Sequence, residues 1–247
     1  MIIMPAMRGL FRKPAELPPP SSPPTYWLKF NSATTIHEDS GSRGSYPALG
    51  WASQNMITSN DVPPGYTGSS ADFTLNGEYG QEKIYHSNNT LGFNLSDKKF
   101  TIEFMIKIEN EFNGTRNILL LWDNTGLTNS SNLLIYVFYA DGYIYISNGY
   151  NTPWYNMYPI KLGIWNHLAI VKSDESQYSI PAVYFNSINL GSGMIALGTA
   201  NVGTIILGSA SVIATSDGLD GKIDDFRIYL DYAKYTSNFT VPTSESN

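Results

Sequence analysis

Three carboxylates lie close together near the C-terminus, in the segment LDGKIDDFRIY. The spacing of Asp220, Asp224 and Asp225 suits acid–base catalysis, a calcium ion or a polar strand surface equally well. The residues that follow alternate between polar and apolar, which places Asp225 and Arg227 on one face and the apolar side chains on the other. We therefore expect a half-buried closing strand with an Asp–Arg pair on its polar side.

Catalytic residues are harder to find elsewhere in the chain. Glycoside hydrolysis needs two carboxyl groups, about 5 Å apart for retention or about 6.5 to 9.5 Å apart for inversion. Glu109 and Glu111 are the nearest such pair, but they stand where a strand should end in a turn, which is typical of a solvated rim. His167 shares a strand face with Ala169 and Val171, which is typical of a buried histidine with one hydrogen bond. No nucleophile-elbow pattern is present. We predict that the protein is not an enzyme.

An aromatic loop, NGYNTPWYNMY, is the best candidate for contact with sugars. Aromatic faces stack on the apolar faces of sugar rings, and asparagine amides pair with hydroxyl groups in both directions. The same side chains could instead cap the end of a sandwich or contact a neighbouring subunit. The candidate residues for glycan binding are Tyr150, Trp154, Tyr155 and Tyr158.

The composition excludes several classes of protein. The chain of 247 residues has no cysteine, so it has no disulfide and no thiolate chemistry. Its net charge of -6 argues against a nucleic acid as partner. No stretch approaches the roughly 18 apolar residues of a membrane span, which argues against a membrane partner. The N-terminal MIIMPAMRGLFRK places its apolar residues before its charges, the reverse of a signal peptide, and we expect it to be retained.

Strand patterns dominate from Tyr26 onward. Only 15% of the residues are charged and 13% are aromatic, a mixture that favours short strands over helices. FTIEFMIKIE at 100–109 alternates and predicts a half-buried antiparallel strand. Asp141-Gly142 predicts a two-residue turn within a hairpin at 133–147. Further strands are expected at 118–122, 167–173, 181–186, 204–209 and 222–230. Two packed antiparallel sheets bury these strands most simply, so the fold class is all-β.

Residues 1–25 differ from the rest of the chain. They include basic residues and six prolines between Pro14 and Pro24, so we expect an extended polyproline II segment outside the sheets. One interpretation is a disordered tail or linker. The other is an arm that docks on a partner subunit. The docking residues would be Arg8, Arg12, Lys13, Pro18, Pro19 and Pro20.

The order of segments over nearly all of residues 26–239 resembles the laminin-G-like, concanavalin A-like jelly-roll superfamily, and we expect one such domain over residues 26–247. The resemblance is carried by LKFNSATTIHEDSGSRG (28–44), SADFTLNGEYGQEKIYHS (70–87), FTIEFMIKI (100–108), GIWNHLAIVK (163–172) and the closing LDGKIDDFRIY (219–229). It implies a two-sheet antiparallel jelly-roll sandwich with an extended N-terminal arm. The hydrolase branch of the family carries a Glu-x-Asp-x-x-Glu strand, which this sequence lacks.

The resemblance also implies a metal site. Jelly rolls of this family often hold a structural Ca²⁺ between the opening acidic turn and the closing strand. The matching positions here are Asn31, Asp39, Asp224 and Asp225. The family often has an acid in place of Asn31, and the loss of that charge would weaken the site. Alternatively, Asp39 caps a turn and one closing-strand aspartate pairs with an arginine.

Fold alone leaves function open, because one sandwich carries lectins, adhesins, glycosidases and structural modules. A domain with a basic, proline-rich arm and no signal peptide resembles bacteriophage virion proteins. The first hypothesis is a non-catalytic virion protein, a capsid decoration or a tail or head appendage. It would be made in the host cytoplasm, bound in multiple copies to capsid or tail subunits, and displayed at the particle surface, where it could adhere to host-surface glycans. The alternative is a soluble lectin-like protein or a glycoside hydrolase.

Overall fold

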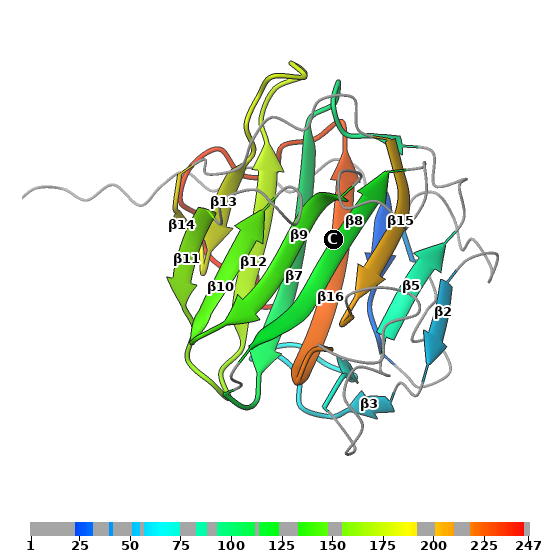
Figure 1. The fold of residues 1–247 in the computed structure, drawn as a ribbon, viewed down its shortest axis with the longest axis vertical. Helices are drawn as coiled ribbons and strands as arrows, with labels where there is room; N and C mark the ends of the chain where they lie inside the picture. Colours follow the sequence, from blue (N-terminus) through cyan, green and yellow to red (C-terminus); the bar gives the residue numbers. More distant parts are fainter. Residues whose placement is uncertain are drawn as a thin grey trace, which may run out of the picture.

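The protein folds as a sandwich of two eight-stranded antiparallel sheets (Figure 1). A computed structural model describes residues 23–31, 40–41, 51–54, 57–74, 83–87, 93–111, 114–123, 133–147, 155–191, 201–209 and 218–244. None of the described residues forms a helix. Within the same ranges, no helix that could cross a membrane is found. The all-β jelly-roll prediction is confirmed.

Sheet A contains both ends of the sandwich domain. Strand β1 (Tyr26–Leu28) pairs with the closing strand β16 (Gly221–Leu230), which also pairs with β7 (Phe100–Ile108). The other strands of this sheet are β3 (Ile57–Ser59), β4 (Ser70–Asp72), β12 (Asn166–Lys172), β13 (Ala182–Phe185) and β14 (Ile188–Asn189). The order is β14-β13-β12-β7-β16-β4-β3.

Sheet B lies in front of sheet A in Figure 1. Its order is β11-β10-β9-β8-β15-β5-β2, and β6 also pairs with β15. The strands are β2 (Trp51–Gln54), β5 (Lys83–Ser87), β6 (Phe93–Asn94), β8 (Thr115–Asp123), β9 (Leu133–Ala140), β10 (Tyr143–Ser147), β11 (Tyr155–Pro159) and β15 (Asn201–Leu207).

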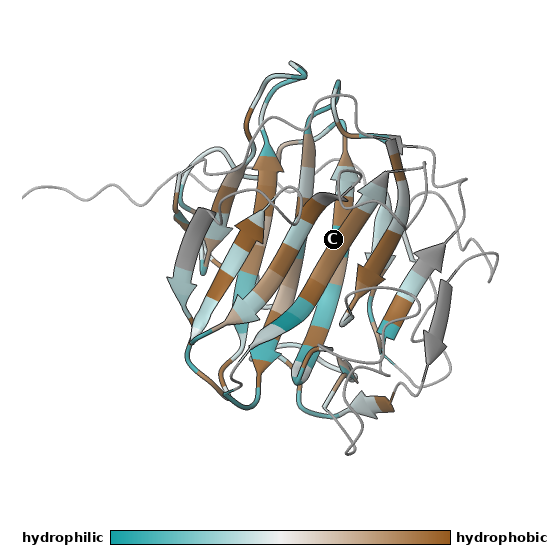
Figure 2. Ribbon diagram, in the orientation of Figure 1, coloured by the Kyte–Doolittle hydropathy of each residue, from teal (hydrophilic) through white to brown (hydrophobic). Residues whose placement is uncertain are grey.

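The core between the sheets follows the predicted alternation. Both sheets send alternate apolar residues inward, and Figure 2 shows β8 hydrophobic along most of its length. The predicted hairpin is present: Ala140 pairs with Tyr143 across a turn in which Asp141 and Gly142 both have positive φ. The inward residues of β7 and β16 are those predicted: Phe100, Ile102, Phe104, Ile106, Ile108, Phe226, Ile228 and, partly buried, Leu230.

The outer face of sheet A differs from the prediction. The polar sides of β7 and β16 were expected to face water, yet Thr101 is 0% and Glu103 2% exposed. The reason is the C-terminal segment, residues 231–244, which crosses this face. Tyr235 packs there against Ala169, Val171 and Tyr184 of sheet A, with Phe239 beside them. The alternation therefore predicted correctly which residues face inward, but the prediction that the polar face is exposed to water was wrong.

The outer face of sheet B carries a second apolar cluster. Tyr136 and Phe138 of β9 stack at 4.6 Å, and Phe138 stacks on Tyr145 of β10 at 5.0 Å with an interplanar angle of 6°. We call these three rings the aromatic ladder. The rest of the cluster consists of Leu120, Trp122, Ala140 and Ile206, with Tyr85 partly buried beside it.

Candidate functional site

A cleft of about 530 Å³ opens where β12 begins, beside the C-terminal segment. Its described walls combine apolar side chains, one indole and two asparagine amides. Ile164 is 51% exposed at this wall. The lining residues are Pro64, Met105, Pro159, Lys161, Ile164, Trp165, Asn166, His167, Phe185, Asn186, Val241, Pro242 and Thr243.

Trp165 is fixed from behind by an ion cluster. A turn at Leu162–Gly163, in which Gly163 has a φ of 68°, leads the chain into the cleft wall. The Trp165 indole Nε1 donates to Asp61 Oδ1 at 3.0 Å, and Lys107 Nζ binds Asp61 Oδ2 at 2.6 Å. Burial alone would raise the pKa of Asp61, but the bonds from Lys107 and Trp165 outweigh it and lower that pKa. The anionic acceptor therefore holds the indole in place.

The two asparagines form a preorganised polar edge. Asn186 and Ser187 form the β13–β14 turn with φ values of 47° and 73°, which directs Asn186 back towards β12. Asn186 Nδ2 donates to Asn166 Oδ1 at 2.8 Å, and Asn166 Nδ2 donates to the carbonyl of Ile164 at 2.8 Å. The His167 amide donates to Asn186 Oδ1 at 2.9 Å. Both side chains are thus held at the cleft before any ligand arrives.

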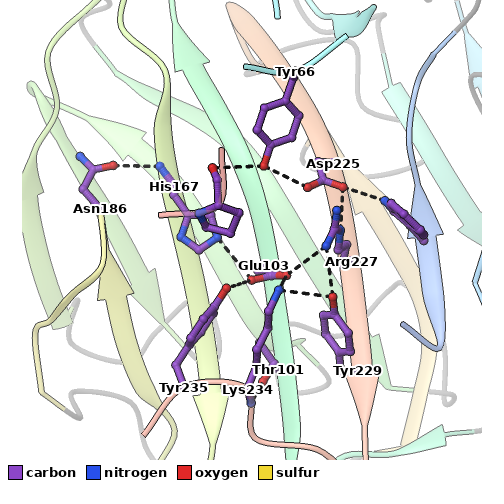
Figure 3. Close-up of polar contacts among 12 residues, drawn as sticks. Tyr66, Thr101, Glu103, His167, Asn186, Asp225, Arg227, Tyr229, Lys234 and Tyr235 are labelled. Atoms are coloured by element: carbon purple, nitrogen blue, oxygen red, sulfur yellow. Dashed lines mark hydrogen bonds and ion pairs between the residues drawn. The ribbon is translucent and has the colours of Figure 1, made fainter. Parts of the chain in front are cut away.

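Beneath the cleft lies a buried ionic network centred on Glu103 (Figure 3). Lys234 Nζ donates to Glu103 Oε1 at 2.5 Å, and the Tyr235 hydroxyl donates to Glu103 Oε2 at 2.6 Å. His167 Nε2 lies 3.4 Å from the same Oε2, and Arg227 approaches to 4.0 Å. Burial opposes the charge of Glu103, but the Lys234 and His167 contacts dominate and hold its pKa well below its usual range. As predicted, His167 is a buried histidine.

Asp225 is the second carboxylate of this network. It stands at a bulge of β16 with a φ of 53°, and the predicted pair with Arg227 is present at 2.7 Å. Trp27 Nε1 donates to Asp225 Oδ1 at 2.7 Å, and the Tyr66 hydroxyl donates to Oδ2 at 3.3 Å. Burial raises the pKa of Asp225 to about 6, and the opposing Arg227 charge does not cancel it.

These contacts bear on the calcium prediction. The carboxylate of Asp225 is bound to three donors and lies beside a guanidinium, so it does not fit a calcium ligand. Asp224 Oδ1 accepts from the Asp225 amide at 2.8 Å. Asn31 lies at the surface, and Asp39 is outside the described residues. No group of three or more potential metal-binding side chains occurs within the described ranges. A site at Asn31, Asp39 and Asp224 stays a prediction that a calorimetric Ca²⁺ titration would test.

The predicted aromatic loop lies only partly within the described residues. Tyr150 and Trp154 are outside them, and only the backbone of Tyr155 is described. Tyr158 stacks on Phe185 at 5.8 Å, and its hydroxyl is 3.5 Å from the Leu190 carbonyl. Its ring therefore caps the sandwich, one of the three roles considered. The next residue, Pro159, lines the cleft, as does Phe185. The docking residues of the arm are also outside the described ranges.

The sequence missed the cleft because its parts are distant in the chain. Trp165 lies within the GIWNHLAIVK motif, where a tryptophan is interpreted as a core side chain, but it is half-buried and lines the cleft. Asn186 gave one usable signal: an Asn-Ser pair between two short strands is typical of a turn with positive φ. Nothing local in the sequence shows that this turn meets Asn166.

Comparison with known proteins identifies the family of the chain. The family model of the concanavalin A-like lectin/glucanases superfamily matches residues 76–233, more than half of the chain. The protein belongs to this superfamily. The predicted family is therefore confirmed, and the chain is a lectin/glucanase-like jelly-roll domain. No curated protein matches the chain in sequence at a significant level.

Solved structures agree in fold with this chain. Domain 4 of AbnA, an extracellular arabinanase from Geobacillus stearothermophilus solved with arabinotriose, has a TM-score of 0.55 and 18% identity, with 86% of this chain and 94% of that domain covered. The binding domain of Paraclostridial Mosquitocidal Protein 1 has a TM-score of 0.58 and 14% identity, with 85% of this chain and 49% of that chain covered. A structure of botulinum neurotoxin type C, whose cell entry depends on interaction with two ganglioside molecules, has a TM-score of 0.56 and 12% identity, with 84% of this chain and 47% of that chain covered. The chain spans about half of each toxin chain. At these identities the likeness establishes the fold alone.

Proposed function

We propose that the protein binds carbohydrate in the cleft at Trp165. The observation that carries the proposal is the combination, in one preorganised cleft, of an accessible indole with the paired amides of Asn166 and Asn186. The cleft volume of about 530 Å³ lies within the range of small-ligand sites.

The chemistry of the walls suits a sugar. A sugar ring offers an apolar C–H face, which stacks on an aromatic ring, and an edge of hydroxyl groups that both donate and accept. Trp165 and Ile164 supply the apolar wall, while the asparagine amides supply donors and acceptors. Lys161, at the rim, adds a cation that would favour an anionic substituent.

The structural relatives support the same class of ligand. The arabinanase domain was solved with arabinotriose, and cell entry of botulinum neurotoxin type C depends on interaction with two ganglioside molecules. Arabinotriose is an oligosaccharide, and a ganglioside carries one. This support is analogy at the level of fold, and the argument for this chain rests on its own cleft.

We further propose that binding is not followed by hydrolysis. None of the described residues that line the cleft is a carboxylate. Glu103, beneath it, is bound to Lys234, Tyr235 and His167 and so is not placed as an acid or a nucleophile. Glu109 is occupied by Lys107 and Lys222. Product release from a panel of polysaccharides would contradict this proposal.

The finer proposal is display on a bacteriophage particle. Its support is the composition of residues 1–25, basic and then proline-rich, which suits an extended arm on a capsid or tail subunit. Replacing Arg8, Arg12 and Lys13 by alanine should lower occupancy on particles and leave the fold unchanged. Unchanged occupancy of purified particles would contradict it.

The test of the glycan proposal is a substitution at the cleft wall. Trp165→Ala should weaken binding to the best ligand of a glycan array by roughly fivefold or more, because an aromatic contact contributes about 1 kcal/mol. Tyr178→Ala is the matched control, because Tyr178 is 77% exposed on another loop. Titration calorimetry measures both. Equal affinity for the two variants would overturn the assignment, and no retention of any glycan by wild type would overturn the function.

A further inference from the structure

Lys161 stands at the rim of the cleft as a cation with no partner among the described residues. Of the described residues that line the cleft, it is the only lysine, arginine, aspartate or glutamate. It is exposed, and it forms no hydrogen bond or ion pair with another described residue. Other lysines of the described ranges lie within 4.0 Å of a carboxylate: Lys98, Lys99, Lys107, Lys222 and Lys234. The charge of Lys161 is therefore available to a ligand.

We propose that the saccharide bound in the cleft carries an anionic substituent, a carboxylate or a sulfate, and that Lys161 binds this group. The inference rests on the proposed glycan binding at Trp165 and adds the chemical class of the glycan. An ammonium attracts an anion as a point charge, so a carboxylate and a sulfate would meet the same requirement.

The backbone that carries Lys161 is fixed on both sides. The Ile160 amide donates to the Gly142 carbonyl at 3.0 Å, and the Gly163 amide donates to the Ile108 carbonyl at 2.8 Å. A lysine on a fixed segment keeps its ammonium within one side-chain length of the cleft, although the side chain itself can rotate.

The carboxylates that reach cleft side chains from behind are already paired. Asp61 accepts from the Trp165 indole, and Glu103 lies 3.4 Å from His167. Each of these two acids lies within 4.0 Å of two cations. The pairs are Asp61 with Lys107 and Lys222, and Glu103 with Lys234 and Arg227. These carboxylates therefore do not cancel the charge that Lys161 presents at the rim.

The polar edge of the cleft adds a donor to this cation. Figure 3 shows the Asn186 amide oxygen directed at the His167 amide, which donates to it at 2.9 Å. Of the two N–H groups of the Asn186 amide, one is donated to Asn166 Oδ1. Asn186 is exposed, and its remaining N–H is the group that it can offer a ligand. An ammonium and an N–H donor, with no carboxylate among the described lining residues, suit an anionic acceptor.

The test compares acidic glycans with their neutral parents. The pairs on the array differ only in a carboxylate or a sulfate, as a uronate differs from the corresponding hexose. Wild type should bind the acidic member of its best pair about threefold to fivefold more tightly, which is the effect of one exposed ion pair. Lys161→Gln should remove this preference and leave the affinity for the neutral member unchanged. Equal binding of both members by wild type, or an unchanged preference in Lys161→Gln, would overturn the proposal.

A matched control removes the same charge elsewhere. Lys99 has a side chain that is 42% exposed, and Met105 of the cleft lies six residues further along an extended strand, about 20 Å away. Lys99→Gln should keep the preference for the acidic glycan. Lys161→Glu should reverse it, because a carboxylate at the rim repels the ligand. An equal loss in Lys99→Gln and Lys161→Gln would trace the preference to net charge and would count against a site at Lys161.

The two proposals for the cleft fail separately. If wild type retains no glycan, binding at Trp165 is wrong, and the inference about Lys161 fails with it. If acidic and neutral glycans bind alike and Trp165→Ala weakens both, the glycan function stands and only the role of Lys161 is wrong. Carboxylated and sulfated glycans are separate arms of the array, so their relative affinities identify which anion the cleft prefers.

Discussion

The two outer faces of this sandwich are both buried, but by opposite chemistry. Over sheet A the C-terminal segment closes on charged groups, with Glu103 and Asp225 paired to Lys234 and Arg227. Over sheet B the buried face is an aromatic ladder. A charged face needs matched partners in fixed positions, whereas an apolar face needs only a cover of suitable shape. The first therefore requires side chains in fixed positions, whereas the second requires only apolar surface of matching shape.

The largest expected effect comes from breaking the charge balance of sheet A. Glu103→Gln removes the anion that Lys234 and Arg227 face, and it leaves buried cations with a missing partner. We expect a loss of about 3 to 5 kcal/mol in the free energy of unfolding, measured by urea denaturation.

The control for that variant is an exposed ion pair. Glu175 lies 3.9 Å from Lys99 and its side chain is 72% exposed, so Glu175→Gln should cost less than about 1 kcal/mol. If the two glutamate variants were equally stable, the Glu103 network would not be the element that holds the C-terminal segment.

A somewhat smaller effect is expected when the aromatic ladder is interrupted. Phe138→Ala removes the central ring and leaves a cavity, and the cost should be about 3 kcal/mol by the same denaturation measurement. Because no charge is involved, the loss should be similar at pH 5 and pH 7. Tyr143→Ala, on the same face but 36% exposed, should cost less than about 1 kcal/mol. Equal costs would mean that the ladder is not covered in solution.

The same contrast explains what the sequence could predict. Alternation in 100–109 and the Asp-Gly turn at 141–142 gave the strands and the hairpin, because inward apolar residues have a period that pairing must respect. The exposure of the polar faces could not be predicted. Thr101 and Glu103 look the same in sequence whether water or the C-terminal segment covers them, and that segment has no strand period of its own.

The candidate cleft was less predictable than the fold. Its walls come from Pro64, from residues 159–167, from the Asn186 turn and from the C-terminal segment, so it exists only after the sheets have assembled. The aromatic loop at 148–158 was the stronger local signal. However, Tyr158 is partly buried against the core, where its ring stacks on Phe185. Aromatic density in a sequence marks large side chains and does not distinguish capping from binding.

The smallest expected effect concerns pH and again separates the two faces. The pKa of Asp225 is raised to about 6 in the folded protein from an ordinary value of 3.8, chiefly by burial. An acid whose pKa is higher in the folded state stabilises the fold below its unfolded pKa, and this stabilisation is lost as the pH rises through the folded value. Wild type should therefore gain about 1 kcal/mol relative to Asp225→Asn between pH 7 and pH 5.

Glu103 acts in the opposite sense, because its pKa is lowered in the folded protein. The stabilisation that it gives is lost only when the pH drops below about 4.5, the ordinary pKa of a glutamate. Denaturant titrations at pH 5, 6 and 7 thus report chiefly on Asp225. Asp231→Asn is the control, since Asp231 forms an exposed pair with Lys98 at 2.7 Å. If wild type and Asp225→Asn changed in parallel with pH, Asp225 would be ionised throughout this range. The network over sheet A would then be held by charge pairing alone, with Arg227 outweighing the burial of its partner.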